Sequence, residues 1–477
     1  MILQLLSALW LPTLLTLLAW LGGVIYFQQA DVEPTPAELL GGFVLLPLAL
    51  LLGYGLLRWS WRHMQARKQA AASADGSAAT PAAAASTEDE SRFLKLQLLL
   101  AELHTPAGDD AATLISAMQE SSLRPALNLE QLDSEGLPLR MSMDAQLDTA
   151  AAQAWLDRHH THTPHTLEPA RLLRLLAMLD APLEAAAEVL AQLPVPQVGE
   201  PRLSGDAQPQ PVLPVHARLC VPEAARPIVA AYVRDKFAAL PQAAVGLVQD
   251  LPAASGHTPD LLQVVDAFCQ GSTREYADAV LLIVASDSLV DESSLAALEA
   301  SNTLYTARTP LGKVPGEAAA VILAVAPALA ARSPCDVLAQ VHRVAAGVRQ
   351  KPLSASGRVE ASTLESLSAL ALQAARVEAA QIAALFSDCD HRANWQLEAA
   401  SLISSSLPEL DPVEQHLATG SALGNLGEAH AAVAMALAAR HVAEHSNPVL
   451  LACMHDVQWR SLTTLSPPTQ DVGMADS

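Results

Sequence analysis

Basic residues are scarce in this sequence, which has 28 Lys and Arg against 50 Asp and Glu over 477 residues. The formal net charge is −22. Because nucleic-acid binding needs a concentrated basic surface, this balance argues against a nucleic-acid partner. The length of 477 residues is sufficient for two or three domains, and the chain is 51% hydrophobic and only 16% charged.

Cysteines are also few, and they are dispersed. No two of them have the spacing of a metal-ligand pair, and an odd, scattered set is typical of reduced thiols in the cytosol. Walker, G-x-G-x-x-G and Gly-x-Ser-x-Gly motifs are absent, which leaves no motif for a nucleotide, a dinucleotide or a serine hydrolase. The five cysteines are Cys220, Cys269, Cys335, Cys389 and Cys453.

Two long apolar segments open the chain. Ile2–Phe27 and Leu39–Leu57 carry no charge, and each is close to the roughly 20 apolar residues that cross a bilayer. The first segment lacks a basic n-region and a clear cleavage site, and the second follows at once. We therefore predict a transmembrane hairpin over residues 1–62 rather than a signal peptide.

The basic residues Arg58, Arg62, Arg67 and Lys68 directly follow the second apolar segment. The positive-inside rule then places the large C-terminal portion in the cytoplasm, and two crossings put Met1 on the same side. Residues 63–91 are rich in Ala and Ser and end acidic, which predicts a flexible linker.

Strand and helix patterns alternate beyond residue 211, which is typical of layered α/β folds. We predict an N-terminal module over residues 92–210, an α/β domain over 211–465 and a disordered tail over 466–477. The predicted strands and strand ends are Val212–Val221, Ala244–Asp250, Val280–Ala285, Ala319–Ala326, Leu385–Asp388 and Pro448–Met454. The predicted helices are Leu167–Leu193, Ile228–Leu240, Pro259–Gln270, Ser293–Ala300, Val337–Val348, Leu364–Ala384 and Gly424–Ala439. Arg92–Leu103 is expected to be amphipathic, and Leu123–Arg140 to be extended with turns.

Four histidines crowd one polar loop, namely His159, His160, His162 and His165. Clustered imidazoles can bind a metal. No carboxylate or thiol accompanies them at helical spacing, so we predict a solvated loop and no metal site.

The stretch Ala279–Pro327 has the most specific pattern. A buried strand ends at Asp287-Ser288, a short helix follows, and the turn Pro315-Gly316-Glu317-Ala318 leads into a second strand. This order resembles the thiolase-like fold of the β-ketoacyl synthases, whose second strand follows a Pro-Gly-Glu-Gly-Ala-Ala turn. We expect the turn to be structural, with Gly316 either at positive φ or in close contact with a neighbour. Glu317 is expected to bond exposed backbone amides at the turn.

That resemblance implies a nucleophilic Cys at a strand-to-helix turn and two His or His/Asn partners. The matching turn, Leu251–Pro259, contains no Cys. Ser387-Asp388-Cys389-Asp390-His391 stands where a His-Gly-Thr-Gly-Thr turn is implied, and Asn425 where the second His is implied. These three departures remove the implied mechanism.

Other candidate nucleophiles are weak. Cys269 lies within the helix after the expected turn and is predicted to be a core residue. Ser255 and His257 are two positions apart and lack a third orienting group. We therefore predict a catalytically degenerate thiolase-like layered fold, with no catalytic residues, no cofactor site and no metal site.

The whole layout resembles the type VI secretion lipase adapter proteins of bacteria. The resemblance spans roughly Arg92 to Leu465 and is carried by Arg124-Pro125-Ala126-Leu127, Glu135-Gly136-Leu137-Pro138 and the two elements above. It implies a non-catalytic adapter that binds a phospholipase effector and presents it to the secretion spike protein. The apolar segments, and not the resemblance, predict that the adapter is anchored at the inner membrane by the hairpin. The alternative is an acyl-transferring condensing enzyme with an atypical nucleophile. Thiolase-like domains usually pair two-fold, so a homodimer is the expectation by analogy.

Overall fold

The structure is a computed structural model that describes residues 90–159, 167–195, 212–240, 243–247, 260–355, 357 and 359–468. The predicted transmembrane hairpin over 1–62 and nearly all of the predicted linker over 63–91 lie outside these residues, so both stay predictions. Among the described helices, none is long and apolar enough to cross a membrane.

Five strands form a first half-sheet. They are β1 (Lys95–His104), β4 (Leu213–Cys220), β5 (Ala243–Leu247), β6 (Val280–Ser288) and β7 (Glu317–Val325). Their order is β5-β4-β6-β7-β1. Strands β5, β4 and β6 are parallel to one another, and β7 is antiparallel to both β6 and β1.

A second half-sheet repeats this arrangement. Its strands are β8 (Ala339–His342), β9 (Ala345–Val348), β10 (Leu385–Ser387), β11 (His416–Ala418), β12 (Val449–Cys453) and β13 (Trp459–Ser466). The order is β11-β10-β12-β13-β8, with β9 also paired to β13. Strands β11, β10 and β12 are parallel to one another, and β13 is antiparallel to both β12 and β8. Antiparallel pairing of β1 with β8 joins the two half-sheets.

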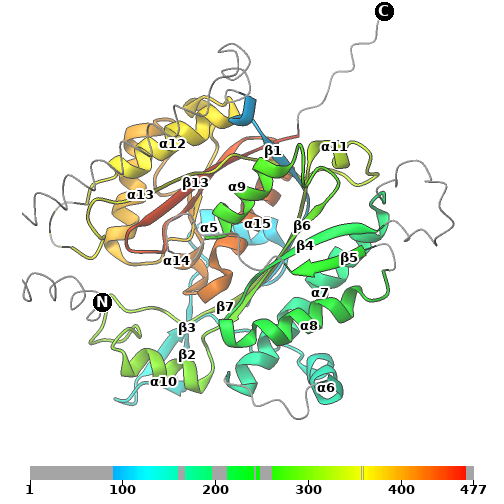
Figure 1. The fold of residues 1–477 in the computed structure, drawn as a ribbon. Helices are drawn as coiled ribbons and strands as arrows, with labels where there is room; N and C mark the ends of the chain where they lie inside the picture. The colour runs from blue at the N-terminus through cyan, green and yellow to red at the C-terminus, as the bar shows by residue number, and fades with distance from the viewer. Residues whose placement is uncertain are drawn as a thin grey trace, which may run out of the picture. The chain divides into compact units, whose positions relative to one another are not determined.

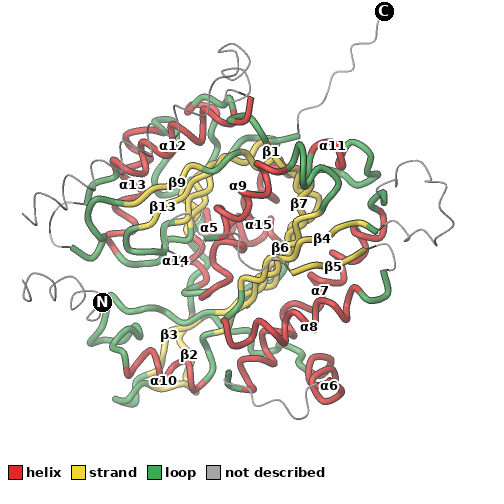
Figure 2. Tube along the Cα trace, viewed as in Figure 1, coloured by secondary structure: helices red, strands yellow, loops and turns green. Residues whose placement is uncertain are grey.

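Helices occupy three layers around the half-sheets (Figure 1). The outer face of the first half-sheet is covered by α7 (Pro169–Gln192) and α8 (Arg226–Phe237). The outer face of the second is covered by α12 (Ser362–Ala375) and α13 (Ala393–Ser406). Between the half-sheets lie α5 (Ala111–Gln119), α9 (Leu261–Gly271) and α15 (His430–His445). The order is therefore helix, sheet, helix, sheet, helix, and Figure 2 shows the two yellow strand groups on either side of the central helices.

Strand β6 shows why the sequence forms this layering. Leu281, Ile283 and Ala285 pack into the central core, whereas Val280, Leu282 and Val284 pack under the outer helices. A strand buried on both faces is apolar at every position rather than at every second one. The prediction of a layered α/β fold is confirmed.

A smaller substructure lies at the end of the first half-sheet. It consists of the hairpin β2 (Ala126–Leu132) and β3 (Pro138–Met141), together with α10 (Glu292–Ala300). Leu139 and Met141 of the hairpin pack with Val290, Leu295 and Leu304 in a core of their own. The remaining helices are α6 (Ala150–His159), α11 (Pro327–Ala330) and α14 (Thr419–Leu423).

Most predicted elements are present, but three predictions are wrong in type or extent. The predicted helix Val337–Val348 is instead the two strands β8 and β9. The predicted helix Leu364–Ala384 ends at Ala375, because Arg376 takes the left-handed conformation with φ 55°. The predicted helix Gly424–Ala439 begins only at His430, after a single 3₁₀ turn, and continues to His445.

The predicted boundary between residues 210 and 211 falls in a stretch that the structure does not describe. On its N-terminal side, β1 lies between β7 and β8 in the joined sheet. The helix α7, which also precedes the boundary, packs on β6 and β7, which follow it. The described residues from 90 to 468 accordingly belong to one compact unit.

Candidate functional site

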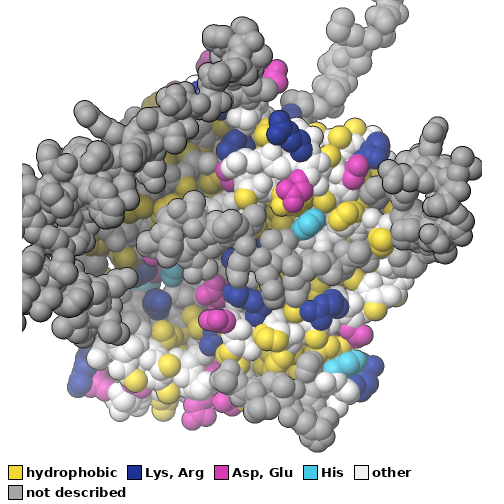
Figure 3. Space-filling view, viewed as in Figure 1, with side chains coloured by type: hydrophobic (Ala, Val, Ile, Leu, Met, Phe, Trp, Pro, Cys, Tyr) yellow, Lys and Arg dark blue, Asp and Glu magenta, His cyan; other side chains and the backbone are white. Residues whose placement is uncertain are grey.

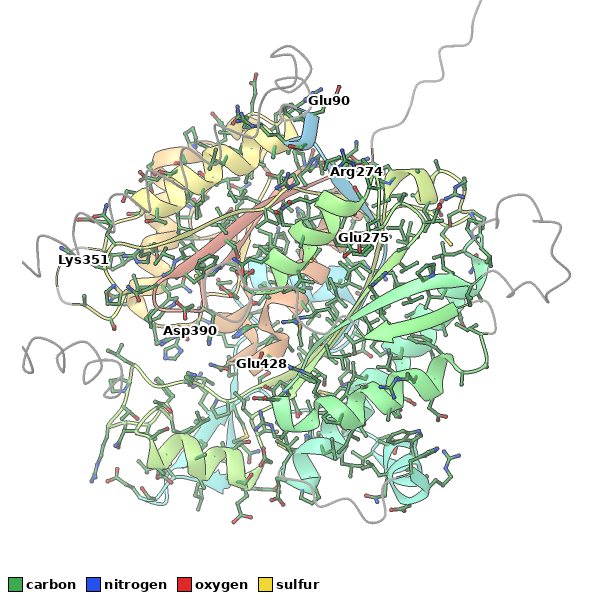
Figure 4. The ribbon with its side chains drawn as sticks, viewed as in Figure 1. Glu90, Arg274, Glu275, Lys351, Asp390 and Glu428 are labelled. Atoms are coloured by element: carbon green, nitrogen blue, oxygen red, sulfur yellow. The ribbon has the colours of Figure 1, made fainter. Side chains whose placement is uncertain are left out.

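Two of the segments that the resemblance singled out, the turn after β10 and the segment just after Asn425, contribute to one pocket of about 250 Å³. It is lined by Asp260 at the start of α9, by Asp388 just after β10, and by Gly427, Glu428 and His430 around the start of α15. We call it the central pocket. The carboxyl ends of parallel strands and the first turns of the following helices meet here, where α/β folds usually bind ligands. Figure 4 shows Glu428 at the foot of α15, near the middle of the molecule.

Asp260 is committed to structure. One oxygen caps α9 by accepting the Gln263 amide at 2.8 Å. The other accepts the indole N–H of Trp459 at 2.8 Å and the hydroxyl of Ser461 at 2.6 Å. This carboxylate therefore ties the start of α9 to β13 and has little capacity left for a substrate.

Asp388 is the most perturbed carboxyl group of the pocket. Its side chain is almost fully buried, and its Oδ1 accepts the Met454 amide at 2.6 Å. Burial raises its pKa to about 7, although the amides of Met454 and His455 and the charge of Arg460 act in the opposite direction. A large part of Asp388 is therefore protonated at neutral pH.

Asp388→Asn should make the stability of the protein less dependent on pH. The folded-state pKa of about 7 lies above the ordinary value of 3.8, so the folded state holds a proton that the unfolded state has lost. The associated stability is fully present below pH 4 and is lost as pH rises to 7. Relative to wild type, the variant should gain about 2 kcal/mol between pH 5 and pH 8. Urea unfolding of the full-length protein in mild detergent measures this, and parallel pH profiles would contradict it.

Two histidines face each other across the pocket wall, His430 and His455, with ring centroids 5.0 Å apart. Burial lowers the pKa of His455 to about 4 and that of His430 well below its usual range. The Gly424 carbonyl lies near the His430 ring but outside hydrogen-bonding geometry, and among the described residues neither ring nitrogen of His430 has a partner. Both rings are neutral at physiological pH, and no hydrogen bond joins either of them to a hydroxyl or thiol of the described residues.

Two thiols also line the pocket. Burial raises the pKa of Cys220 to about 11, while Arg218 partly opposes this increase. Burial raises the pKa of Cys453 well above its usual range. The thiolate is the reactive form, and the raised pKa values keep both groups as protonated thiols at neutral pH. The two thiols and the two histidines gave no sequence signal, since they come from three distant segments: Cys220 ends β4, His430 begins α15, and Cys453 and His455 follow one another closely at the end of β12.

Cys269 and Cys389, which lie in or near the segments that the resemblance implies to be catalytic, are both core residues. This was the prediction for Cys269. Cys269 is fully buried in α9, and burial raises its pKa to about 12. Cys389 is fully buried, with its Sγ 3.4 Å from Met454 Sδ, and burial raises its pKa. Its neighbour His391 points elsewhere and stands edge-on to Tyr305 at 5.0 Å.

Cys269 and Cys389 should resist alkylation in the native protein, and their Ala variants should keep partner binding. Neither thiol is exposed or deprotonated, so iodoacetamide should modify them only after denaturation. Peptide mass spectrometry measures the rate of iodoacetamide modification at each cysteine in the native and in the urea-treated protein. Stoichiometric modification of either residue within minutes under native conditions would refute this prediction.

Asn425, which stands at the implied second His, is a structural residue. Its amide donates to Val314 O at 2.7 Å, its carbonyl accepts the Gly316 amide at 3.1 Å, and its Oδ1 accepts the Gly427 amide at 3.0 Å. A Cβ on Gly316 would lie 2.3 Å from the backbone oxygen of Leu423. The structural role predicted for Gly316 is thus confirmed through close packing rather than positive φ.

Two buried carboxylates brace this turn. Glu317 is ion-paired with Arg174, and it accepts the Ser288 hydroxyl at 2.8 Å and the Asp144 amide at 2.8 Å. Glu317 does bond a backbone amide, but that amide belongs to Asp144 in a distant segment rather than to the turn, and the arginine partner was not predicted. Asp287 accepts Arg171 at 2.6 Å on one oxygen and the Glu428 amide at 3.1 Å on the other.

Some predicted features lie outside the described residues. They are the turn Leu251–Pro259 with Ser255 and His257, the histidines 160, 162 and 165, and most of the tail over 466–477. His159 is described and stacks on Trp155 at 4.6 Å. Within the described ranges, no three His, Cys, Asp or Glu side chains are placed to hold a metal ion. On the face seen in Figure 3, acidic and basic side chains are intermixed.

No family model and no curated protein match the sequence. Solved structures do match it at low identity. The ishigamide ketosynthase/chain length factor is 12% identical, with a TM-score of 0.49, over 79% of this chain and 100% of that one. The ketosynthase from module 6 of the bacillaene synthase of Bacillus subtilis 168 is 9% identical, with a TM-score of 0.49, over 79% and 72%. The oxazolomycin ketosynthase domain KS7 of Streptomyces albus JA3453 is 13% identical, with a TM-score of 0.47, over 79% and 75%.

Proposed function

We propose that residues 90–468 form a thiolase-like fold that has lost condensing chemistry and acts by binding a protein partner. The observation that carries this proposal is the convergence at the central pocket. The two segments where the resemblance implies histidine partners, at Asp388 and around Asn425, lie at one cavity or its wall, yet Asp388 and Asn425 bond the protein's own backbone there, and Asp260 at the start of α9 bonds Gln263. Condensing chemistry needs an activated thiolate with a paired base.

The partner follows from the adapter resemblance. We propose that the chain binds a phospholipase effector and presents it to a secretion spike protein, while residues 1–62 anchor it in the bacterial inner membrane. The basic cluster after the second apolar segment supports a cytoplasmic location for the remainder. A homodimer remains part of the proposal by analogy with thiolase-like domains.

A condensing enzyme with an atypical nucleophile is the second candidate, and one observation favours it. Cys220 lines the central pocket at the end of β4, beside Arg218, whose positive charge favours the thiolate. The enzyme would need substrate binding to lower the Cys220 pKa from about 11 by several units. Acyl transfer to Cys220 would form a thioester and release the thiol of the acyl donor.

One preparation tests both candidates. The full-length protein, purified from its native organism in mild detergent, should carry along a phospholipase or a spike protein identifiable by mass spectrometry. Incubation of the same preparation with acyl-coenzyme A and acyl carrier protein thioesters should leave all five cysteines unmodified. A thioester on Cys220 that disappears in Cys220→Ala, without any bound phospholipase, would establish the enzyme instead.

A further inference from the structure

The motif Arg124-Pro125 has no role in the central pocket. It leads into the β2–β3 hairpin and lines a separate, open cavity of about 640 Å³. Arg140 of β3, Tyr305, His391 and Val413 contribute to other walls of the same cavity. We call this surface the hairpin groove.

The charge of the hairpin groove is opposite to that of the chain. Among the described residues that line it, Arg124 and Arg140 are charged and none is Asp or Glu. Acidic residues outnumber basic ones by 50 to 28 in the whole sequence, so a lining without carboxylates is distinctive. The exposed acids Glu120, Glu130 and Glu414 are close in sequence but do not line the groove.

Both arginines are held in place with donors to spare. Arg124 Nε donates to Ser121 O at 3.3 Å, and Arg140 Nη1 donates to Pro125 O at 3.1 Å. Each of these bonds uses one of the five N–H donors of a guanidinium group. The planar fork that remains suits carboxylate recognition.

Apolar side chains continue the surface along the hairpin. Leu127 is the cross-strand neighbour of Arg140, so both side chains are on the same face, opposite the face that carries Leu139 and Met141 into the core. Leu127 is 58% exposed, Leu129 two positions on is 77% exposed, and Val413 in the groove is 74% exposed. Exposed apolar side chains beside fixed charges are typical of protein-binding sites.

We propose that the hairpin groove is the docking site for an acidic, amphipathic segment of a protein partner. Carboxylates of that segment would pair with Arg124 and Arg140, and its apolar side chains would cover Leu127, Leu129 and Val413. Two arginines in a lining that otherwise combines apolar side chains with Ser, Gln, His and Tyr suit a short peptide segment, whereas a nucleic acid would need a longer basic track. The inference rests on the proposed adapter function and assigns its binding surface.

Site-specific cross-linking tests the position and chemistry of the partner. A photo-reactive phenylalanine analogue would replace Leu127, Val413 or, as a matched exposed control on α12, Leu370, which is 54% exposed. In native cells, the first two positions should cross-link to a segment with net negative charge and apolar side chains, and Leu370 should not. Cross-links to a second copy of this chain or to a basic segment would overturn the proposal.

Charge reversal then tests the contribution of the arginines. The double variant Arg124→Glu/Arg140→Glu should bind the cross-linked partner at least tenfold more weakly, and 0.5 M salt should weaken wild-type binding more than it weakens the variant. Arg234→Glu, at an exposed position on α8, is the matched control and should bind as wild type does. Val413→Asp lies in an exposed loop and tests the apolar half without threatening the fold, with Leu370→Asp as its control.

The outcomes separate this inference from the proposed function. If the partner binds wild type and the double variant equally, the groove is refuted while the adapter function stands. If wild type binds no partner and acylates Cys220 instead, both proposals fail. Equal melting temperatures of the variants are required before any loss of binding is assigned to the groove.

Discussion

Glu398→Gln should destabilise the protein by about 3–5 kcal/mol, which is the usual cost of removing one member of a buried ion pair. Glu398 on α13 has no exposed surface and lies between two arginines, Arg460 with no exposed surface and Arg349 with 8% exposed. Arg460 donates to Oε2 at 2.8 Å from Nη2, and Arg349 pairs with Oε1. Glutamine keeps the shape but leaves two buried guanidinium charges without a counter-charge.

Urea unfolding of the full-length protein in mild detergent measures this loss. Glu409→Gln is the matched control, because Glu409 follows the same helix and is exposed, so its neutralisation should change stability by less than 0.5 kcal/mol or so. Joint replacement of Glu398, Arg349 and Arg460 by apolar residues of similar volume should recover much of the loss. Equal unfolding midpoints for Glu398→Gln and Glu409→Gln would show that the triad contributes little.

Gly316→Ala should cost about 3 kcal/mol and disturb the central pocket as well. The added Cβ would lie 2.3 Å from Leu423 O and 3.2 Å from Leu426 Cδ2, so the backbone has to separate at the Pro315–Asn425 bridge. Asn425 binds the amide of Gly427, and Glu428 follows directly, so the displacement reaches residues that line the pocket.

Gly347→Ala provides the control for this substitution. A Cβ there would meet only side-chain atoms, the nearest at 3.5 Å, and no backbone strain is present, so stability should change little. Thermal unfolding distinguishes the two variants. A Gly316→Ala protein that melts within a degree of wild type would mean that the bridge can relax, contrary to the packing argument.

The sheet interior was predictable because its composition leaves few alternatives. Val280–Ala285 and Ala319–Ala326 are uninterrupted apolar runs, the first of them rich in β-branched residues and each bounded by turn residues, which favours a strand covered on both faces. The helices α7, α8 and α9 were equally predictable from the sequence, since each combines apolar periodicity with a recognisable start such as the Asp260 cap.

Strands β8, β9 and β13 were not predictable from local pattern. Val337–Val348 is rich in Ala and Val and suits either conformation, and pairing with β1 and β13 decides the outcome. In β13 the polar residues Ser461, Thr463 and Thr464 are fully buried and bonded inside the fold, so their polarity concealed a central strand.

The candidate site was predictable only in outline. The resemblance directed attention to Asp388 and to the segment around Asn425, and the structure brings both to the central pocket or its wall. Cys220 and His455 could not be connected with them, because strand order alone brings these distant segments together. Likewise, nothing in the sequence near Glu398 indicates that two arginines from other segments would bury it.

The position of β1 has a consequence for how the chain folds. His104 pairs with Ala319, 215 positions later, and Lys95 pairs with His342, so β1 has no sheet partner until most of the chain has been made. Non-local pairings of this kind slow folding and prolong the exposure of apolar segments. The uncharged run Leu96–Ala101 would promote aggregation in that interval, but Lys95 and Glu102 flank it as charged gatekeepers. In the finished fold the same two residues fasten β1 to its neighbours, through Gln340 of β8 at 2.9 Å and through Arg440 of α15.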